Sequence, residues 1–158
     1  MREKALGRDM IVVSACLVGI NCRHDGSSKT KPELLNLLEK KGAVPICPEQ
    51  LGGLPTPRPP AKIQSGDGFD VLKSRSRVID IKGRDVTPQF IKGAIEALNI
   101  ARLVGAGEAI LKDKSPSCGV NYIWEDDGLK EGKGVLTALL IDNGIKVTSG
   151  DTYKFRDV

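Results

Sequence analysis

The sequence predicts an α/β protein in which helices cover the faces of a mostly parallel sheet. Short apolar segments rich in β-branched residues alternate along the chain with longer segments whose apolar residues recur at helical spacing. The alternation runs from strand to helix and back until a final strand. It is typical of parallel sheets, because each crossover between parallel strands needs a connection about as long as a helix. We therefore expect a Rossmann-like three-layer sandwich.

Four segments have the length and composition of strands. They cover residues 10–15, 43–47, 108–113 and 145–149. The first, "MIVVSA", is a short β-branched run of the kind found in buried parallel strands. The second contains Pro45, which cannot donate a hydrogen bond to a neighbouring strand. We expect that strand toward an edge of the sheet.

Three segments predict helices. They cover residues 31–42, 87–105 and 134–144. Pro32 and Pro88 suit the first turns of the first two, where a missing N–H costs nothing. Gly42 and the pair Asn143-Gly144 are typical helix ends. These helices separate the four strands.

The segment from Leu51 to Arg84 interrupts this alternation. Its first part, "LGGLPTPRPPAKI", is too rich in proline and glycine to predict a regular element. The stretch "VLKSRSRVIDIKGRD" (71–85) alternates apolar and basic residues, which indicates either a hairpin with one wet face or a patch for an anionic partner. We expect a hairpin or loop insertion after the second strand. Without an internal repeat or linker, the chain is expected to form one domain over residues 1–158.

Composition narrows the class of protein. The chain has 158 residues, a net charge of +4 and 4% aromatic residues, which argues against a broad base-stacking surface. No apolar run approaches the ~20 residues that span a bilayer. The first ten residues lack the apolar stretch of a secretory signal. We therefore expect a cytoplasmic protein with no membrane partner, whose four cysteines are reduced.

Three cysteines follow three different predicted strands. Cys16 and Cys47 lie where the first and second strands end, and Cys118 lies in the loop that leaves the third. The carboxyl ends of parallel strands meet at one edge of the sheet, so these thiols should converge there. They could hold a metal or an iron–sulfur cluster, act as nucleophiles, or simply be small buried hydrophobes. No CxxC pair is present, and Cys22 stands nearest to Cys16.

Polar residues accompany these cysteines. Glu49 follows Cys47 by two positions and could activate water, and Ser115 and Ser117 precede Cys118. Turn or cap formation would explain all three equally well. His24 is the only histidine and stands in a polar loop, where a solvated role is expected. The phosphate-loop patterns GxxxxGK[ST] and GxGxxG are absent.

Five longer motifs resemble a known family. They are "VSACLVGINCRHDG", "CPEQLGGLPTPRPPAKI", "DVTPQFIKGA", "AILKDKSPSCGV" and "GKGVLTALLIDNGIKV". Together they resemble the single-domain thiouracil desulfidases, from about Met10 to Val147. The resemblance implies a 4Fe-4S cluster held by only three cysteines. It also implies that the fourth iron takes the sulfur of a thiolated nucleobase. Water then supplies the oxygen that replaces this sulfur on the base, without net redox change.

Carried onto this chain, the resemblance implies Cys16, Cys47 and Cys118 as cluster ligands. Cys22 also lies in a family motif, but the end of the predicted strand favours Cys16 as the ligand, so Cys22 is expected to be a spare thiol. The resemblance implies Glu49 as the group that activates water and Ser115 as a polar partner of the substrate or its leaving sulfur.

One position departs from the family pattern. His24 stands where that pattern, "CRYDG", has an aromatic residue. The departure puts in doubt any stacking contact from this position, and with it the preferred base.

Two alternatives to a free-base enzyme stay open. The chain could act on thiolated uridine in tRNA, although its charge is only modestly basic. It could also be a carrier of iron–sulfur cluster, zinc or sulfide that catalyses nothing. The expected partner is a small thiolated nucleobase, and the chain is expected to be a monomer or a homodimer.

Overall fold

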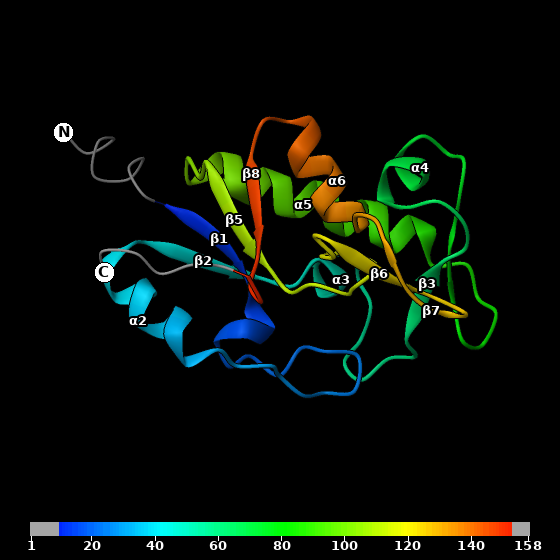
Figure 1. Ribbon diagram of the computed structural model, residues 1–158, viewed down its shortest axis with the longest axis horizontal. Coiled ribbons are helices and arrows are strands. Elements are labelled where there is room, and N and C mark those ends of the chain that lie inside the picture. Colours follow the sequence, from blue (N-terminus) through cyan, green and yellow to red (C-terminus); the bar gives the residue numbers. More distant parts are fainter. Residues whose placement is uncertain (1–9, 153–158) are drawn as a thin grey trace.

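The computed structural model describes residues 10–152. Residues 1–9, which belong to the segment that lacks the apolar stretch of a secretory signal, lie outside the described part. Its central sheet has four parallel strands: β1 (Ile11–Ser14), β2 (Ala43–Ile46), β5 (Glu108–Leu111) and β8 (Lys146–Ser149). Their order across the sheet is β2-β1-β5-β8 (Figure 1). All four predicted strands are confirmed, and β2, which contains Pro45, is an edge strand.

Helices cover both faces of this sheet. They are α2 (Pro32–Lys40), α5 (Thr87–Leu103) and α6 (Val135–Asp142). Each lies within two residues of its predicted ends. In β1, Ile11 and Val13 pack with α2, whereas Val12 joins the core formed with α5 and α6. Alternate side chains of the strand thus pack into two cores, one on each face of the sheet. This arrangement confirms the three-layer α/β sandwich.

The insertion after β2 differs in detail from the prediction. A two-stranded antiparallel sheet is present, but β4 (Val78–Asp80) pairs with β3 (Ala61–Ile63), at the end of the proline-rich stretch. The first strand of the predicted hairpin is wrong, because Val71 and Leu72 belong to α4 (Gly68–Leu72). A reciprocal cap between Asp67 and Asp70 starts this helix. The alternation of apolar and basic residues after Asp70 favoured a strand, so the start of this helix was not predicted.

Shorter elements were not predicted. A 3₁₀ turn, η1 (Ala15–Val18), follows β1, and α3 (Pro48–Leu51) follows β2. A second antiparallel hairpin joins β6 (Tyr122–Glu125) to β7 (Gly128–Glu131). The two helical elements, η1 and α3, are single turns of four residues, too few for a helical pattern to identify.

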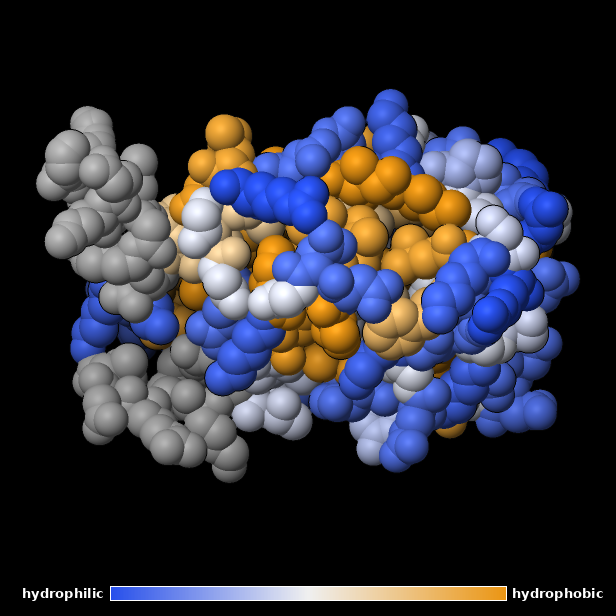
Figure 2. All heavy atoms as spheres, turned by 90° about the horizontal axis from the view of Figure 1, so that it is seen from above, coloured by the Kyte–Doolittle hydropathy of each residue, from blue (hydrophilic) through white to orange (hydrophobic). Residues whose placement is uncertain are grey.

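Seen from above, apolar side chains gather in the middle of the surface, with hydrophilic ones around them (Figure 2). Large apolar residues exposed on α5 and α6 include Ile95, Leu103 and Ile141. None of the helices within residues 10–152 combines the length and the apolar character that crossing a membrane requires.

Candidate active site

A cavity of about 170 Å³ lies where the strand order reverses, between β1 and β5. The loops that follow β1, β2 and β5 line it, as expected for the carboxyl edge of such a sheet. The backbone N–H of Lys112 donates to Ser14 Oγ at 2.9 Å, which joins the ends of β1 and β5 directly. All four cysteines of the chain line this one cavity.

The structure brings the three predicted cysteines together and adds the fourth. Cys16 lies in η1, Cys47 immediately precedes α3, and Cys118 lies in the loop after β5. Cys22, which sequence reasoning left as a spare thiol, is buried and packs against Cys16 and Cys47. The Sγ of Cys47 donates to the carbonyl oxygen of Cys22 at 3.7 Å. All four are free thiols.

Three of these thiols, those of Cys22, Cys47 and Cys118, have a raised pKa and therefore favour the protonated form. A hydrogen bond with Cys16 is the main cause that raises the pKa of Cys22, to about 11. Burial raises the pKa of Cys118 to about 12. A hydrogen bond with Cys22, together with burial, raises the pKa of Cys47. Loading a metal centre here must therefore release protons, because thiolates are the ligands.

The donor set fits an iron–sulfur cluster. Soft sulfur ligands suit such clusters, and cysteine thiolates usually hold them. Within the described residues, no three His, Cys, Asp or Glu side chains converge closely enough to coordinate a single ion. A four-coordinate zinc would need its sulfurs all about 2.3 Å from one point. Thiols that reach one cavity from three different loops match ligands that bind different irons of a cluster.

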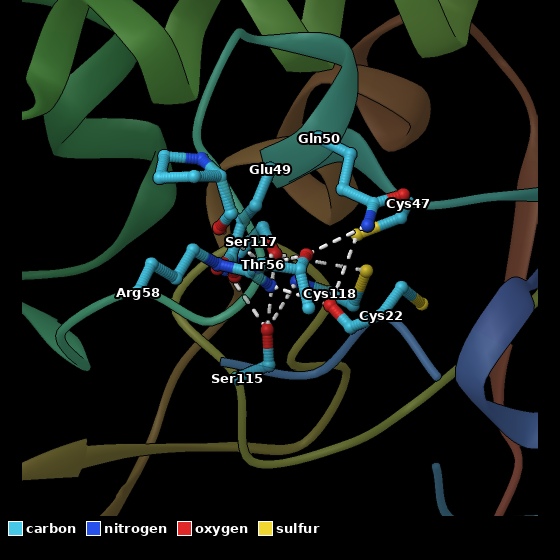
Figure 3. A network of polar contacts seen from close by, with 10 residues as sticks. Cys22, Cys47, Glu49, Gln50, Thr56, Arg58, Ser115, Ser117 and Cys118 are labelled. Carbon is cyan, nitrogen blue, oxygen red and sulfur yellow. Dashed lines mark hydrogen bonds and ion pairs between the residues drawn. The ribbon is translucent and has the colours of Figure 1, made fainter. Parts of the chain in front are cut away.

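Glu49 lies beside these thiols on α3, held from two sides (Figure 3). Its Oε1 accepts from Arg58 Nε at 2.7 Å, and its Oε2 accepts from Ser117 Oγ at 2.9 Å. The Glu49 side chain is 15% exposed and that of Arg58 only 4%. The carboxylate therefore has a fixed position at the cavity.

Arg58 is the residue that sequence reasoning missed most clearly. Besides Glu49, it donates to the carbonyl oxygen of Cys22 at 2.8 Å, to that of Pro55 at 3.2 Å and to Thr56 Oγ1 at 2.9 Å. It thus ties the loop after β1 to α3. Its partners lie up to 36 positions away in the sequence, so no local pattern in the proline-rich stretch could identify it.

The Ser-Pro-Ser-Cys loop is held by its own serines and by α6. Ser115 Oγ accepts from the backbone N–H groups of Ser117 and Cys118, at 3.1 and 3.0 Å. The carbonyl oxygens of Pro116 and Ser117 accept from the first N–H groups of α6. Ser115 therefore shapes the turn that presents Cys118 and also lines the cavity.

Asp113 anchors the same loop and also lines the cavity. It is 4% exposed, and its Oδ1 accepts from four backbone N–H groups, those of Lys114, Val120, Asn121 and Tyr122. Burial alone would raise the pKa of Asp113, but these four hydrogen bonds outweigh it and hold the pKa below its usual value.

Two residues with aromatic rings also line the cavity. His24 reaches the cavity, and its backbone carbonyl accepts from Arg58 N at 2.8 Å. Trp124, on β6, also lines the cavity, and sequence reasoning gave it no role.

The fold and this site define an α/β enzyme class in which a parallel sheet presents several free thiols and a carboxylate at one cavity. The chain belongs to the 2-thiouracil desulfurase family, whose model matches residues 11–152. The family resemblance of the motifs is thereby confirmed.

Two known proteins are similar to this chain over most of its length. The chain is 43% identical over 143 residues to the uncharacterized protein YbbK of Bacillus subtilis (strain 168), covering 89% of this chain and 95% of that one. It is 41% identical to a solved structure, the [4Fe-4S]-dependent thiouracil desulfidase TudS. That match has a TM-score of 0.80 and covers 91% of this chain and 92% of the other.

Proposed function

We propose that this chain hydrolytically removes the sulfur of a thiolated pyrimidine base such as 2-thiouracil and that it needs a 4Fe-4S cluster to do so. The observation that carries the proposal is the shared cavity, in which four free thiols and the held carboxylate of Glu49 meet. The [4Fe-4S] dependence of the similar thiouracil desulfidase supports it.

Cys16, Cys47 and Cys118 are the proposed cluster ligands, because each follows a different strand of the sheet at the same edge. Cys22 packs between Cys16 and Cys47 and is the proposed spare thiol. When bound, the cluster supplies an open iron with high affinity for the sulfur of the base.

The remaining chemistry belongs to the chain. In the proposed reaction water adds to the thiocarbonyl carbon, the carbon–sulfur bond breaks, and sulfide leaves while a carbonyl forms. The reaction involves no net oxidation or reduction. Glu49 is the proposed base that takes a proton from the water. An ionised carboxylate has about four lone-pair sites, and Arg58 and Ser117 occupy only two, so Glu49 can still accept from that water.

The two serines have different proposed tasks. Ser117 donates to Glu49 and therefore orients the base. Ser115 lines the cavity, so its hydroxyl is the proposed polar partner of the substrate or of the departing sulfide, toward which it would turn from Ser117 Oγ, 3.0 Å away.

Substitution of Glu49 separates chemistry from cluster assembly. Glu49→Gln should keep its iron and visible absorption but lower the rate of uracil formation roughly 10²- to 10⁴-fold, because the base is gone. Glu96→Gln, on the exposed side of α5, is the matched control and should behave like wild type. Unchanged turnover by Glu49→Gln would remove Glu49 from the mechanism.

The complementary variants concern the thiols. Cys118→Ala should fail to assemble the cluster, whereas Cys22→Ala should retain it, with circular dichroism confirming that both fold. The ligand assignment is wrong if Cys118→Ala retains a full cluster and activity, or if Cys22→Ala loses the cluster.

A further inference from the structure

We propose that Trp124 is the surface on which the flat ring of the base stacks, an inference that rests on the proposed function and names how the site recognises its substrate. Trp124 lines the same cavity as the four thiols and Glu49, and it is the chain's only tryptophan. Within the described residues, no other Phe, Tyr or Trp lines this cavity.

The β6 strand directs this side chain outward. Ile123 is 1% exposed and belongs to the core, whereas its neighbour Trp124 is 47% exposed. Successive side chains of a strand point to opposite faces, so the indole lies on the outer face of the hairpin. Across the hairpin Trp124 pairs with Leu129, which shares that face. Nearly half of the Trp124 surface is therefore open to a ligand.

The hairpin is fixed at the edge of the cavity. β6 passes beside β3 (Figure 1), and Lys62 Nζ donates to the carbonyl oxygen of Glu125 at 3.4 Å. Pro60 and Ala61, at the start of β3, line the cavity together with Trp124. This attachment gives the indole a defined place relative to the thiols.

A thiolated pyrimidine has a planar conjugated ring. The other lining groups are thiols, polar and charged side chains, the imidazole of His24 and small aliphatic residues such as Ile46 and Pro60, and none of them has an aromatic surface as large as the indole. Aromatic side chains bind such rings by offset stacking, whatever the substituents. His24 provides only a small imidazole in the loop after β1. Stacking on Trp124 would hold the ring plane while Glu49 and the thiols act at its edge, and it would favour conjugated rings over puckered ones.

Kinetics of the holoprotein give the first test. Trp124→Ala should raise KM for 2-thiouracil roughly 5- to 150-fold, the range measured for loss of one base–aromatic stack, with a much smaller change in kcat. Trp124→Phe should restore most of the affinity. Tyr122→Ala is the matched control, because Tyr122 lies on the same face of β6, is 41% exposed and does not line the cavity.

Fluorescence of the single tryptophan gives a readout that needs no turnover. Uracil added to the holoprotein should change the Trp124 emission saturably, and 5,6-dihydrouracil, which has similar edges but a puckered ring, should bind more weakly. Trp124→Leu, followed by equilibrium dialysis, should lose affinity for uracil while its affinity for dihydrouracil changes little.

The outcomes separate the two proposals. If wild type forms uracil from 2-thiouracil, yet Trp124→Ala keeps its KM and uracil leaves the emission unchanged, the stacking role is overturned. Equal loss of uracil and dihydrouracil affinity in Trp124→Leu would also overturn it, because the contribution of Trp124 to binding would then not depend on a planar ring in the ligand. If wild type binds uracil on Trp124 but never turns over 2-thiouracil, the proposed function fails and the stacking surface stands.

Discussion

Glu49 and Arg58 form the central pair of the site, and each depends on partners from distant segments. Glu49 could be singled out from the sequence because it lies two positions after Cys47, and strand ends place such residues predictably. Arg58 and Ser117 could not be assigned as its partners, since they reach it from 9 and 68 positions away. Sequence spacing thus points to the proposed base but not to the side chains that hold it.

Asp113 makes a prediction about stability and pH. Its folded pKa is depressed, so the carboxylate stabilises the fold above its unfolded pKa of roughly 4, and this contribution is lost as the pH falls through the folded pKa. Asp113→Asn should therefore lower the free energy of unfolding by about 1–3 kcal/mol at pH 7. The difference from wild type should shrink in acid.

Urea unfolding at pH 7 and at pH 3 measures this difference. Asp127→Asn, at an exposed position in the turn between β6 and β7, is the matched control and should be near neutral at both pH values. A deficit of Asp113→Asn that stays constant or grows toward pH 3 would contradict the assigned role.

At the scale of elements, α3 sets the position of Glu49 by packing backbone to backbone on α5. A Cβ at Gly93 would lie 1.8 Å from the carbonyl oxygen of Pro48, and one at Gly52 would lie 1.9 Å from that of Gln89. Neither residue can carry a side chain without separating the helices. The short helix that bears Glu49 is thus fixed by glycines on both sides of the contact.

Gly93→Ala tests this contact. Although alanine favours a helix over glycine by up to about 1 kcal/mol, overpacking should destabilise the fold by about 1–3 kcal/mol and shift Glu49, lowering activity. Thermal unfolding and turnover check both effects. Gly107→Ala is the control, because nothing lies within 4 Å of its Cβ position. Wild-type stability and turnover in Gly93→Ala would show that the close packing is not required.

The strands of the central sheet and the three longer helices were predictable, and the other elements were not. Strands β1, β2, β5 and β8 and helices α2, α5 and α6 follow from apolar spacing and end signals. The β3–β4 and β6–β7 pairs have strands of three or four residues, whose pairing depends on contacts with the rest of the fold. Trp124 was overlooked for the same reason, because its role depends on where the β6–β7 hairpin docks.

For the whole molecule, the larger of the two cores connects the central sheet to the insertion and to the second hairpin, which predicts one cooperative unit. The larger core joins Val12 of the central sheet, Ile63 and Val78 of the insertion and Ile123 of the second hairpin. Urea unfolding followed by far-ultraviolet circular dichroism and by Trp124 fluorescence should therefore give coincident transitions. Separate midpoints would show that the insertion or hairpin unfolds independently, contrary to the expected single domain.

The whole chain also provides the most direct test of the central claim, that its thiols and Glu49 perform hydrolytic desulfuration. The measurement is anaerobic reconstitution with iron and sulfide, a count of iron per chain, and incubation with 2-thiouracil. The account predicts about four irons per chain, with uracil and sulfide formed in equal amounts. A chain that assembles the cluster yet leaves 2-thiouracil intact would contradict it and would favour a carrier role or a tRNA substrate.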